Sequence, residues 1–456
     1  MKNNDMDRRE FLRRVGIGAA GIGAAACTPG GKNASPAAVN VDEGPGEMVL
    51  RTNNRNGDKV SLLGYGCMRW RMKKGPDGKD IVDQENVNEL VDHALANGVN
   101  YYDTSPVYLQ GQSETAAGIA LSRHPRNSYY LATKLSNFGV NTREASIKMY
   151  HDSMEQLRTD YFDYYLLHSI GRGGRQAFKE RYEDNGMMDY MLKEREAGRI
   201  RNLGFSFHGA KDEFDELLAL DDLYHWDFVQ IEMNYLDWRY AKEPRNTQAE
   251  YLYEELDKKE LPIVIMEPLL GGRLARVPDN IAARLKERDP DHSVASWAFR
   301  FVGSYPRVLT ALSGMTNMDV LNDNLNTFRH FRPLTENDID FLMKTADMID
   351  HYPTVPCNDC KYCMPCPYGL DIPGVFLHYN AMVNTGQIAT SKEQKDYRKL
   401  RREYLISYDR AVESLRQADH CTTCGQCLPT CPQSIDIPKE LRRIDSYVES
   451  LRQDRL

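Results

Sequence analysis

From residue 48 to about residue 330 the chain alternates between short apolar runs and longer stretches with helical periodicity. An Asn56-Gly57 turn between Met48–Arg51 and Lys59–Leu62 predicts a β-hairpin ahead of this alternation. The apolar runs then predict eight buried strands: Leu62–Cys67, Asn100–Asp103, Tyr129–Lys134, Tyr164–His168, Asn202–Ser206, Phe228–Asn234, Pro262–Glu267 and Val308–Ser313. The amphipathic stretches predict helices at Val87–Asn97, Glu114–Leu121, Arg143–Leu157, Tyr190–Ala197, Asp212–Leu220, Ala249–Lys258, Ser293–Val302 and Asp319–Phe328.

Regular strand–helix alternation indicates an α/β fold with right-handed crossovers and a parallel sheet. Eight units in about 270 residues have the size of a closed (β/α)8 TIM barrel, which we place at residues 48–333. A doubly wound open sheet is the alternative. It is disfavoured because the one dinucleotide fingerprint, Gly16–Gly21, follows no strand and lies in the N-terminal segment.

The N-terminal segment predicts export. Residues Asp7–Arg13 match a twin-arginine signal, and the apolar run Val15–Ala26 is too short to span a bilayer. We therefore interpret residues 1–27 as a signal peptide, cleaved near Ala26 or lipidated at Cys27, and residues 28–47 as a disordered linker. The expected location is the periplasm or the outside face of the cytoplasmic membrane. A cytosolic protein with a chance Arg pair is the less favoured alternative.

Composition bounds the class of protein. The 456 residues are 41% hydrophobic and 27% charged, as in a soluble globular chain of two or three domains. The net charge of −8 argues against nucleic acid as a partner, because a phosphate-binding surface needs a basic excess.

Titratable side chains follow the ends of successive predicted strands. Asp103 ends the second strand, Lys134 the third and His168 the fourth, and Tyr108 lies in the loop that Pro106 begins. One such residue is usually a solvated rim residue. Four of them point to a common site, because active sites of barrels lie at the carboxyl ends of the strands.

These four side chains suit proton transfer to a carbonyl. A free Tyr, with a pKa near 10, is a weak acid at neutral pH. We expect the Lys134 ammonium to lower the pKa of Tyr108, with Asp103 holding Lys134 in place and His168 orienting the substrate oxygen.

Residues 48 to about 330 resemble an aldo/keto reductase. The resemblance rests on Leu63–Gly66, Asp103–Tyr108, Thr133-Lys134, Leu167-His168, Gly204–Ser206 and Ser313–Met315 with Asn324. It implies catalytic roles for Tyr108, Asp103, Lys134 and His168. It also implies further roles at three sets of residues: Ser206, Gln230 and Asn234 at a nicotinamide ring; Gly271, Gly272, Arg273, Ser313, Gly314, Asp323 and Asn324 along the rest of an NAD(P)(H) cofactor; and Met68, Arg69 and Trp70 in the substrate pocket.

Two departures from that family pattern are visible. Cys67 stands where many members have Thr, and it reads as a small buried hydrophobe. Met315–Val320 contains no Lys or Arg, so the 2′-phosphate of NADP lacks an obvious clamp.

Eight of the ten cysteines lie beyond Pro356, in two runs that each end in Cys-Pro. Each run continues into Asp-Ile-Pro, at Asp371–Pro373 and Asp436–Pro438, where the Asp can cap and the Pro begin a helix. The runs are Cys357, Cys360, Cys363 and Cys366, followed by Cys421, Cys424, Cys427 and Cys431.

Disulfides and a zinc ribbon are alternatives, but the second run matches the bacterial dicluster pattern and favours two 4Fe-4S clusters. In that pattern the fourth Cys serves the other cluster. Cluster one would use Cys357, Cys360, Cys363 and Cys431, and cluster two would use Cys421, Cys424, Cys427 and Cys366. The first run is one residue shorter than the pattern, with two residues before Cys366.

The long insert between the runs resembles α-helical dicluster ferredoxins, so residues 334–456 are expected to form a smaller, mainly helical ferredoxin-like domain. Helices are predicted at Glu336–Ile349, Glu393–Leu405 and Ala411–Gln417. The basic residues of 395–402 are interpreted as a solvated helix face.

Three functions are compatible with this sequence. The first is an exported iron–sulfur oxidoreductase that interconverts a carbonyl and an alcohol, with a sugar or small aldehyde as substrate and a membrane-linked electron-transfer partner. The second is a nicotinamide-dependent reductase with structural clusters, and the third a non-catalytic subunit that docks a redox partner. In the family the C-terminal tail covers the active-site mouth, so a cluster is expected on the Tyr108 side of the barrel.

Overall fold

The computed structural model describes residues 47–244 and 246–456. Eight parallel strands close into a barrel in the order β10-β11-β12-β3-β6-β7-β8-β9. This confirms the predicted TIM barrel. The strands are β3 (Leu63–Gly66), β6 (Tyr101–Asp103), β7 (Tyr130–Leu135), β8 (Phe162–Gly171), β9 (Ile200–His208), β10 (Phe228–Glu232), β11 (Ile263–Met266) and β12 (Val308–Ser313).

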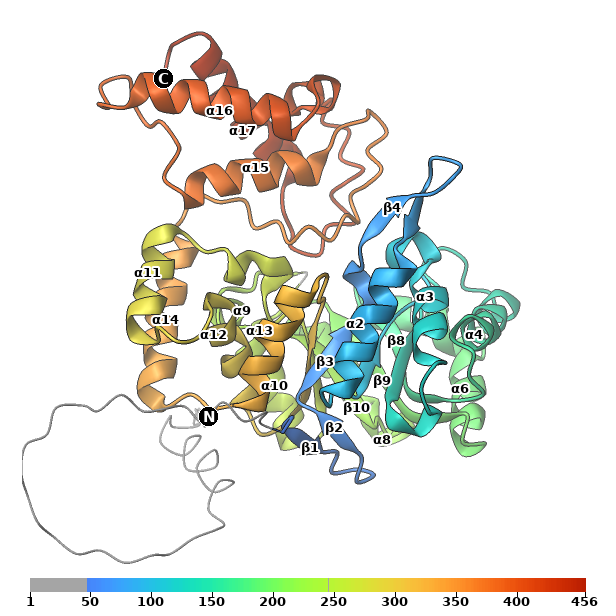
Figure 1. Ribbon diagram of the computed structural model, residues 1–456. Helices are drawn as coiled ribbons and strands as arrows, with labels where there is room; N and C mark the ends of the chain where they lie inside the picture. Colours follow the sequence, from blue (N-terminus) through green and yellow to red (C-terminus); the bar gives the residue numbers. More distant parts are fainter. Residues whose placement is uncertain (1–46, 245) are drawn as a thin grey trace, which may run out of the picture.

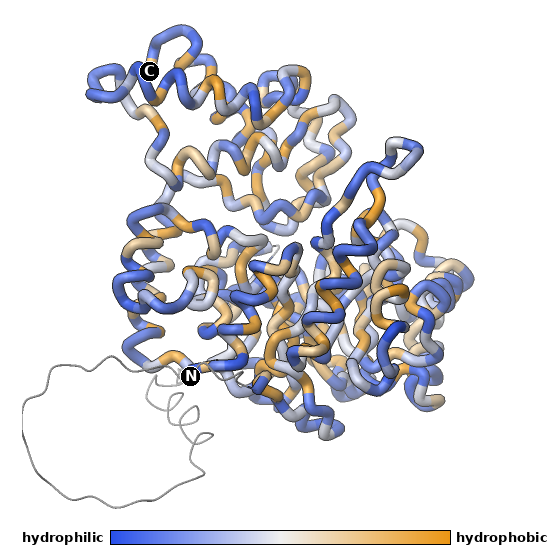
Figure 2. The backbone as a smooth tube through the Cα atoms, in the orientation of Figure 1, coloured by the Kyte–Doolittle hydropathy of each residue, from blue (hydrophilic) through white to orange (hydrophobic). Residues whose placement is uncertain are grey.

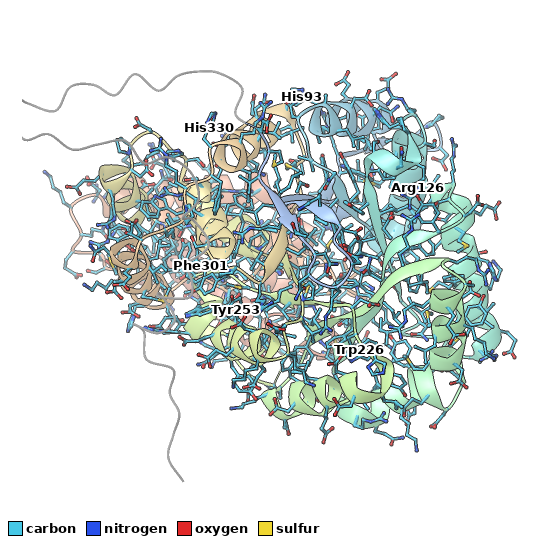
Figure 3. All side chains as sticks on the ribbon, turned by 90° about the horizontal axis from the view of Figure 1, so that it is seen from below. His93, Arg126, Trp226, Tyr253, Phe301 and His330 are labelled. Atoms are coloured by element: carbon cyan, nitrogen blue, oxygen red, sulfur yellow. The ribbon has the colours of Figure 1, made fainter. Side chains whose placement is uncertain are left out.

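Helices pack around the outside of the strands (Figures 1 and 3). Those that follow the predicted periodicity are α2 (Gln84–Ala96), α3 (Ser113–Leu121), α4 (Arg143–Leu157), α6 (Met187–Glu196), α7 (Lys211–Ala219), α10 (Ala249–Lys258), α12 (Val294–Gly303) and α13 (Met318–Arg329). Between α10 and α12, Tyr253 and Phe301, both labelled in Figure 3, pack on Tyr305 with ring centroids 4.9 and 5.2 Å away.

Several elements were not predicted, among them the short helices α5 (Gly174–Phe178), α8 (Asp221–Tyr224) and α9 (Asp237–Tyr240). The hairpin of β4 (Met72–Lys74) and β5 (Asp80–Val82) projects from the barrel, and α11 (Asp279–Arg288) precedes α12. The predicted hairpin at Asn56-Gly57 is present as β1 (Leu50–Thr52) and β2 (Lys59–Ser61). Gly57 has a φ of +85°, which a residue with a side chain adopts only under strain.

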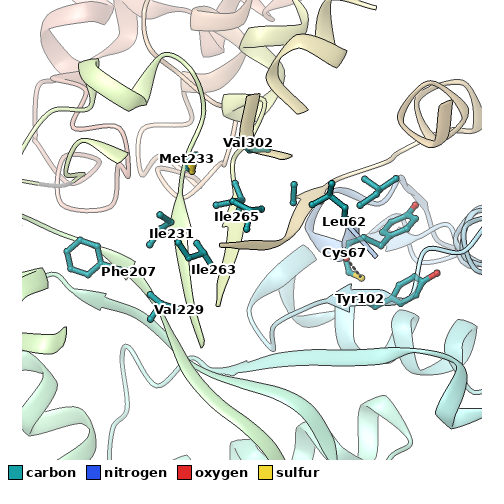
Figure 4. Close-up of a cluster of buried hydrophobic side chains, with 14 of the residues drawn as sticks. Leu62, Cys67, Tyr102, Phe207, Val229, Ile231, Met233, Ile263, Ile265 and Val302 are labelled. Carbon is teal, nitrogen blue, oxygen red and sulfur yellow. Dashed lines mark hydrogen bonds between the residues drawn. The ribbon is translucent and has the colours of Figure 1, made fainter. Parts of the chain in front are cut away.

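Side chains of each strand alternate between the inside of the barrel and the helical layer. Outward-facing Val229, Ile231, Ile263 and Ile265 fill the layer between strands and helices (Figure 4). Cys67 is fully buried in this layer, as predicted. A smaller inner cluster fills the barrel itself and contains Val60, Tyr101, Ala132, Tyr164, Leu166, Phe228, Val264, Leu309 and Leu312.

The C-terminal domain lies over one end of the barrel, and the β1–β2 hairpin lies at the other (Figure 1). Its helices are α15 (Ile372–Asn384), α16 (Tyr397–Ala411) and α17 (Ile437–Arg452), and they share a separate apolar core. Polar positions dominate the outside of both parts in Figure 2. Helix α14 (Glu336–Asp350) packs in the barrel core, so we place the boundary between the two cores near Tyr352 rather than at residue 334.

The helices that follow the cysteine runs begin as predicted. The Asp371 carboxylate accepts a hydrogen bond from the amide of Gly374, and the Asp436 carboxylate accepts one from the amide of Lys439. The insert differs from prediction. Helix α16 begins at Tyr397 rather than Glu393, and only the short 3-10 helix η7 (Ser414–Arg416) forms within 411–417.

The predicted signal peptide and linker, with Cys27, lie almost wholly outside the described residues. Within residues 47–244 and 246–456, no helix combines the length and the apolar character that crossing a bilayer requires.

Candidate active site

Asp103, Lys134 and His168 all lie on the inner face at the carboxyl ends of β6, β7 and β8. The Lys134 ammonium donates to Asp103 Oδ1 at 2.5 Å and to the Thr104 carbonyl at 2.8 Å. Gln230 donates to the other Asp103 oxygen at 3.2 Å. Because Lys134 and Asp103 are almost fully buried, this hydrogen-bonded ion pair is held in one geometry.

Tyr108 completes the predicted group from the short helix η3 (Tyr108–Gly111). The Lys134 Nζ atom lies 4.9 Å from the centre of the Tyr108 ring. The expected lowering of the Tyr108 pKa is not found. Burial, followed by the charges of Asp103 and Glu267, raises the pKa of Tyr108 well above its usual value. Tyr108 therefore keeps its proton as a neutral phenol, is a weaker acid than a free Tyr, and can protonate only an oxygen on which negative charge develops.

His168 is held as a neutral imidazole. Its Nδ1 atom lies 2.5 Å from Ser136 Oγ and 3.3 Å from Ser105 Oγ. Burial and the nearby Lys134 and Arg181 lower the pKa of His168 well below its usual value. With Nδ1 engaged by the serines, Nε2 is left to bind a substrate oxygen.

A cavity of about 120 Å³, here called the catalytic cavity, opens between these side chains. Its lining includes Asp103, Tyr108, His168, Ser206 and Gln230 from the barrel. Asn358, Cys360, Tyr362 and Pro432 of the C-terminal domain close its other side. The first cysteine run thus lies on the Tyr108 side of the barrel, as predicted.

Three titratable barrel residues that line the catalytic cavity escaped the sequence prediction: His208, Glu232 and Glu267. Two-residue alternation could have indicated His208 and Glu232, which follow Ser206 and Gln230 on the same inner face. Burial and the neighbouring carboxylates Asp237 and Glu267 raise the pKa of Glu232 well above its usual value. Burial also raises the pKa of Glu267 and lowers the pKa of His208 to about 4.

Two of the three residues predicted for the substrate pocket line the cavity, and the third does not. Met68 and Arg69 line the catalytic cavity, but Trp70 is 3% exposed and packs in the core against Tyr65, with ring centroids 6.0 Å apart. Asn234 does not line the catalytic cavity, and its side chain donates to Asp237 at 2.7 Å. It accepts from the Leu236 and Asp237 amides at 3.0 and 2.9 Å and so stabilises the turn after β10.

The predicted dinucleotide residues are not brought together around one cavity. Gly314, like Ser206 and Gln230, lines the catalytic cavity, whereas Gly271, Gly272 and Arg273 line a second one. Asn324 donates to Ser313 at 2.9 Å, and Ser293 donates to Asp323 at 2.7 Å.

The eight C-terminal cysteines gather into two groups. The Cys431 thiol is among the charges that raise the pKa of the Cys357, Cys360 and Cys363 thiols. Cys366, Cys421 and Cys424 do the same to Cys427, after burial. A cavity of about 230 Å³ is lined by Cys366 and the first three cysteines of the second run, and also by Cys363 of the other group.

This arrangement fits two 4Fe-4S clusters. Each group offers four thiols, and each thiol of such a cluster binds a different iron. Within the described part of the chain no three candidate ligands converge on a single metal ion, and the nine described cysteines form no disulfide.

A closed parallel barrel with titratable residues at its strand ends defines an enzyme of the TIM-barrel class. Residues 62–346 match the aldo/keto reductase family model, and residues 356–436 match a 4Fe-4S dicluster domain. The chain belongs to the aldo/keto reductase family, is an oxidoreductase and carries a 4Fe-4S dicluster domain.

Curated relatives match parts of the chain. The oxidoreductase YqkF of Bacillus subtilis is 24% identical over 61% of this chain and 90% of its own length. L-galactose dehydrogenase of Arabidopsis thaliana is 32% identical, but the match spans 28% of this chain and only 40% of that relative.

Solved structures share the barrel fold. The aldo-keto reductase AKR11C1 of Bacillus halodurans superposes with a TM-score of 0.52 at 21% identity, covering 66% of this chain and 96% of that one. An aldo-keto reductase of Klebsiella pneumoniae in complex with NADPH gives a TM-score of 0.51 at 20% identity, covering 65% of this chain and 95% of that one.

Proposed function

We propose that this protein interconverts a small carbonyl compound and its alcohol, and that the electrons pass through the C-terminal iron–sulfur domain. The observation that carries the proposal is the shared catalytic cavity. Tyr108 and His168 line one side of it, and Cys360 lines the other.

The barrel residues supply the proton chemistry. Reduction of a carbonyl to an alcohol consumes two electrons and two protons, and oxidation releases them. His168 binds the substrate oxygen, and Tyr108 delivers the proton to that oxygen. The Lys134–Asp103 pair fixes the ring of Tyr108 from below. Glu232, whose raised pKa keeps it protonated, holds the second proton, which would form the carbon–hydrogen bond of the alcohol as two electrons reach the carbonyl one at a time.

Two groups of four cysteines would each hold a 4Fe-4S cluster, which exchanges one electron at a time. Cys357, Cys360, Cys363 and Cys431 belong to the group beside the catalytic cavity. Cys366, Cys421, Cys424 and Cys427 form the outer group, in which Cys424 is exposed. We assign electron exchange with a redox partner to this outer side, where a membrane-linked electron-transfer protein would dock.

Export by the twin-arginine route forms part of the proposal. That route carries folded proteins, so clusters assembled in the cytoplasm would travel inside the fold. The support is the Asp7–Arg13 motif with its short apolar run. The place of action would be the periplasm or the outer side of the cytoplasmic membrane, with lipid attachment at Cys27 as the alternative to cleavage.

The test combines one substitution with one spectrum. Tyr108→Phe is expected to lower carbonyl turnover by about a hundredfold to ten-thousandfold while iron content stays unchanged. Tyr251→Phe is the matched control, because that phenol contacts Asp215 on the surface. Unchanged turnover in Tyr108→Phe would refute the role of the phenol.

Electron export is tested by adding alcohol substrates to anaerobic protein without any nicotinamide. Loss of the broad visible absorbance of the clusters, which reports their reduction, supports the proposal. Clusters that stay oxidised, with turnover only on added NADH or NADPH, would instead identify a nicotinamide-dependent reductase with structural clusters.

A further inference from the structure

Two cavities lie at the carboxyl end of the barrel, and Arg69 borders both of them. The catalytic cavity contains the residues expected at a nicotinamide ring, Ser206 and Gln230, and also Gly314. The second cavity, of about 180 Å³, contains Gly271–Arg273. A dinucleotide needs one continuous groove, and the residues expected to hold its two halves face different cavities here.

Arg69 and residues 357–359 form the wall between the two cavities, which we call the partition. The Arg69 guanidinium donates to the Asn358 carbonyl at 2.7 Å and to the Asp359 carbonyl at 3.5 Å. It also lies 4.0 Å from the Glu267 carboxylate. These contacts join the barrel directly to the first cysteine run.

The backbones on the two sides of the partition touch. A Cβ atom added to Gly271 would stand 2.0 Å from the carbonyl oxygen of Asn358. A Cβ atom on Gly314 would stand 3.1 Å from the Arg69 side chain. No ligand fits between Gly271 and Asn358, and Arg69 covers Gly314.

The catalytic cavity is also too small to hold a dinucleotide. Its volume of about 120 Å³ is close to the roughly 150 Å³ of an engineered cavity that holds benzene. Pockets for larger ligands measure about 300–1,000 Å³. The catalytic cavity therefore suits a carbonyl compound about the size of benzene, and a dinucleotide exceeds it several times over.

We propose that the C-terminal domain occupies the dinucleotide groove of the barrel, so that the enzyme works on a small carbonyl or alcohol without binding NAD(P)H. The inference deepens the proposed function and rests on it for the carbonyl chemistry. A second set of contacts, separate from those of Arg69, also holds the C-terminal domain in place on the barrel. Asn246 donates to the Pro432 carbonyl at 3.0 Å, and Gln433 donates to Glu232 at 2.9 Å.

The first experiment measures binding. The full-length protein with its clusters is titrated with NADH and NADPH up to about 1 mM, the upper end of ordinary KM values. Nicotinamide fluorescence and saturation-transfer NMR report the bound cofactor, and the Klebsiella reductase is the positive control. We expect no saturable binding. Saturable binding of either nucleotide would overturn the inference and leave the Tyr108→Phe test of the carbonyl chemistry intact.

The second experiment tests the partition by hydrogen exchange. Arg69→Ala removes charged hydrogen bonds, so amides of 270–275 and 357–359 should exchange about tenfold faster. Arg276→Ala is the matched control, because Arg276 borders the second cavity only. Iron content and circular dichroism check that both variants fold. Unchanged exchange in Arg69→Ala, or an equal rise in Arg276→Ala, would overturn the partition.

Discussion

At the scale of single residues, burial decides which side chains hold protons. Tyr108 and Glu232 both line the catalytic cavity, where carboxylate neighbours and burial favour their neutral forms. His168 is neutral because burial and the positive charges of Lys134 and Arg181 lower its pKa. The site thus offers neutral donors to a substrate oxygen, apart from the Lys134–Asp103 ion pair beneath them.

Glu114 is expected to make the stability of the fold decrease as the pH rises. This carboxyl is buried behind β7 and accepts from Thr133 at 2.5 Å and from Ser153 at 3.1 Å. Burial raises the pKa of Glu114 from 4.5 to about 7. The folded state therefore keeps a proton that the unfolded chain loses, and the stabilisation present below pH 4.5 disappears as the pH rises to about 7.

We expect Glu114→Gln to remove this dependence. The free energy of unfolding, measured with denaturant at pH 5 and pH 7.5, should fall between these pH values by at most about 3 kcal/mol more in the wild type than in the variant. Glu144→Gln, at the exposed start of α4, is the control and should follow the wild type. Parallel pH profiles of the wild type and Glu114→Gln would show that Glu114 does not bind the extra proton.

At the scale of elements, local signals predicted most of the barrel. Helices α4 and α10 begin and end at the predicted residues, because their apolar positions recur at helical spacing up to the last turn. Helix α16 starts later than expected, since polar residues 393–396 match a helix face as well as a loop. The β4–β5 hairpin carries little apolar alternation and gave no signal.

The helix cap predicted from the Asp-Ile-Pro repeat can be tested at the start of α17. Asp436→Ala removes the carboxylate that accepts from the Lys439 amide, at a cost of about 1 kcal/mol. Amides of the first turn of α17 should then exchange about fivefold faster, measured by hydrogen exchange. Ser446→Ala, on the exposed side of the same helix, should leave those amides unchanged. Equal rates in Asp436→Ala and wild type would show that Pro438 alone begins the helix.

At the scale of the whole molecule, the two cysteine runs cooperate across the C-terminal domain. Residues of one run complete the group formed by the other, with Cys431 beside Cys357 and Cys366 beside Cys427. The group beside the catalytic cavity is therefore anchored at two places on the barrel, through Arg69 and through Asn246.

Paired substitutions test this crossed arrangement. Cys431→Ser and Cys357→Ser should each lower iron from about eight to about four per chain, and the double variant should lose no more. Cys431→Ser with Cys427→Ser should lose nearly all iron. Iron analysis and electron paramagnetic resonance of anaerobically purified protein measure the iron content and the remaining clusters of each variant. If the Cys431→Ser, Cys357→Ser double variant instead loses nearly all iron while the Cys431→Ser, Cys427→Ser variant keeps about four, Cys431 binds the same cluster as Cys421, Cys424 and Cys427.

The sequence by itself determined the order of strands and helices, the positions of Asp103, Tyr108, Lys134 and His168 at the strand ends, and the cysteine spacing. Each of these depends on residues near one another in the chain or on strand alternation. Only the tertiary structure decided three matters: that Trp70 packs in the core, that Tyr108 holds its proton, and that residues 357–359 divide the expected dinucleotide groove. The physical reason is the same for all three. Burial and close backbone contact arise between segments as distant as Arg69 and Asn358, and periodicity carries no information about such contacts.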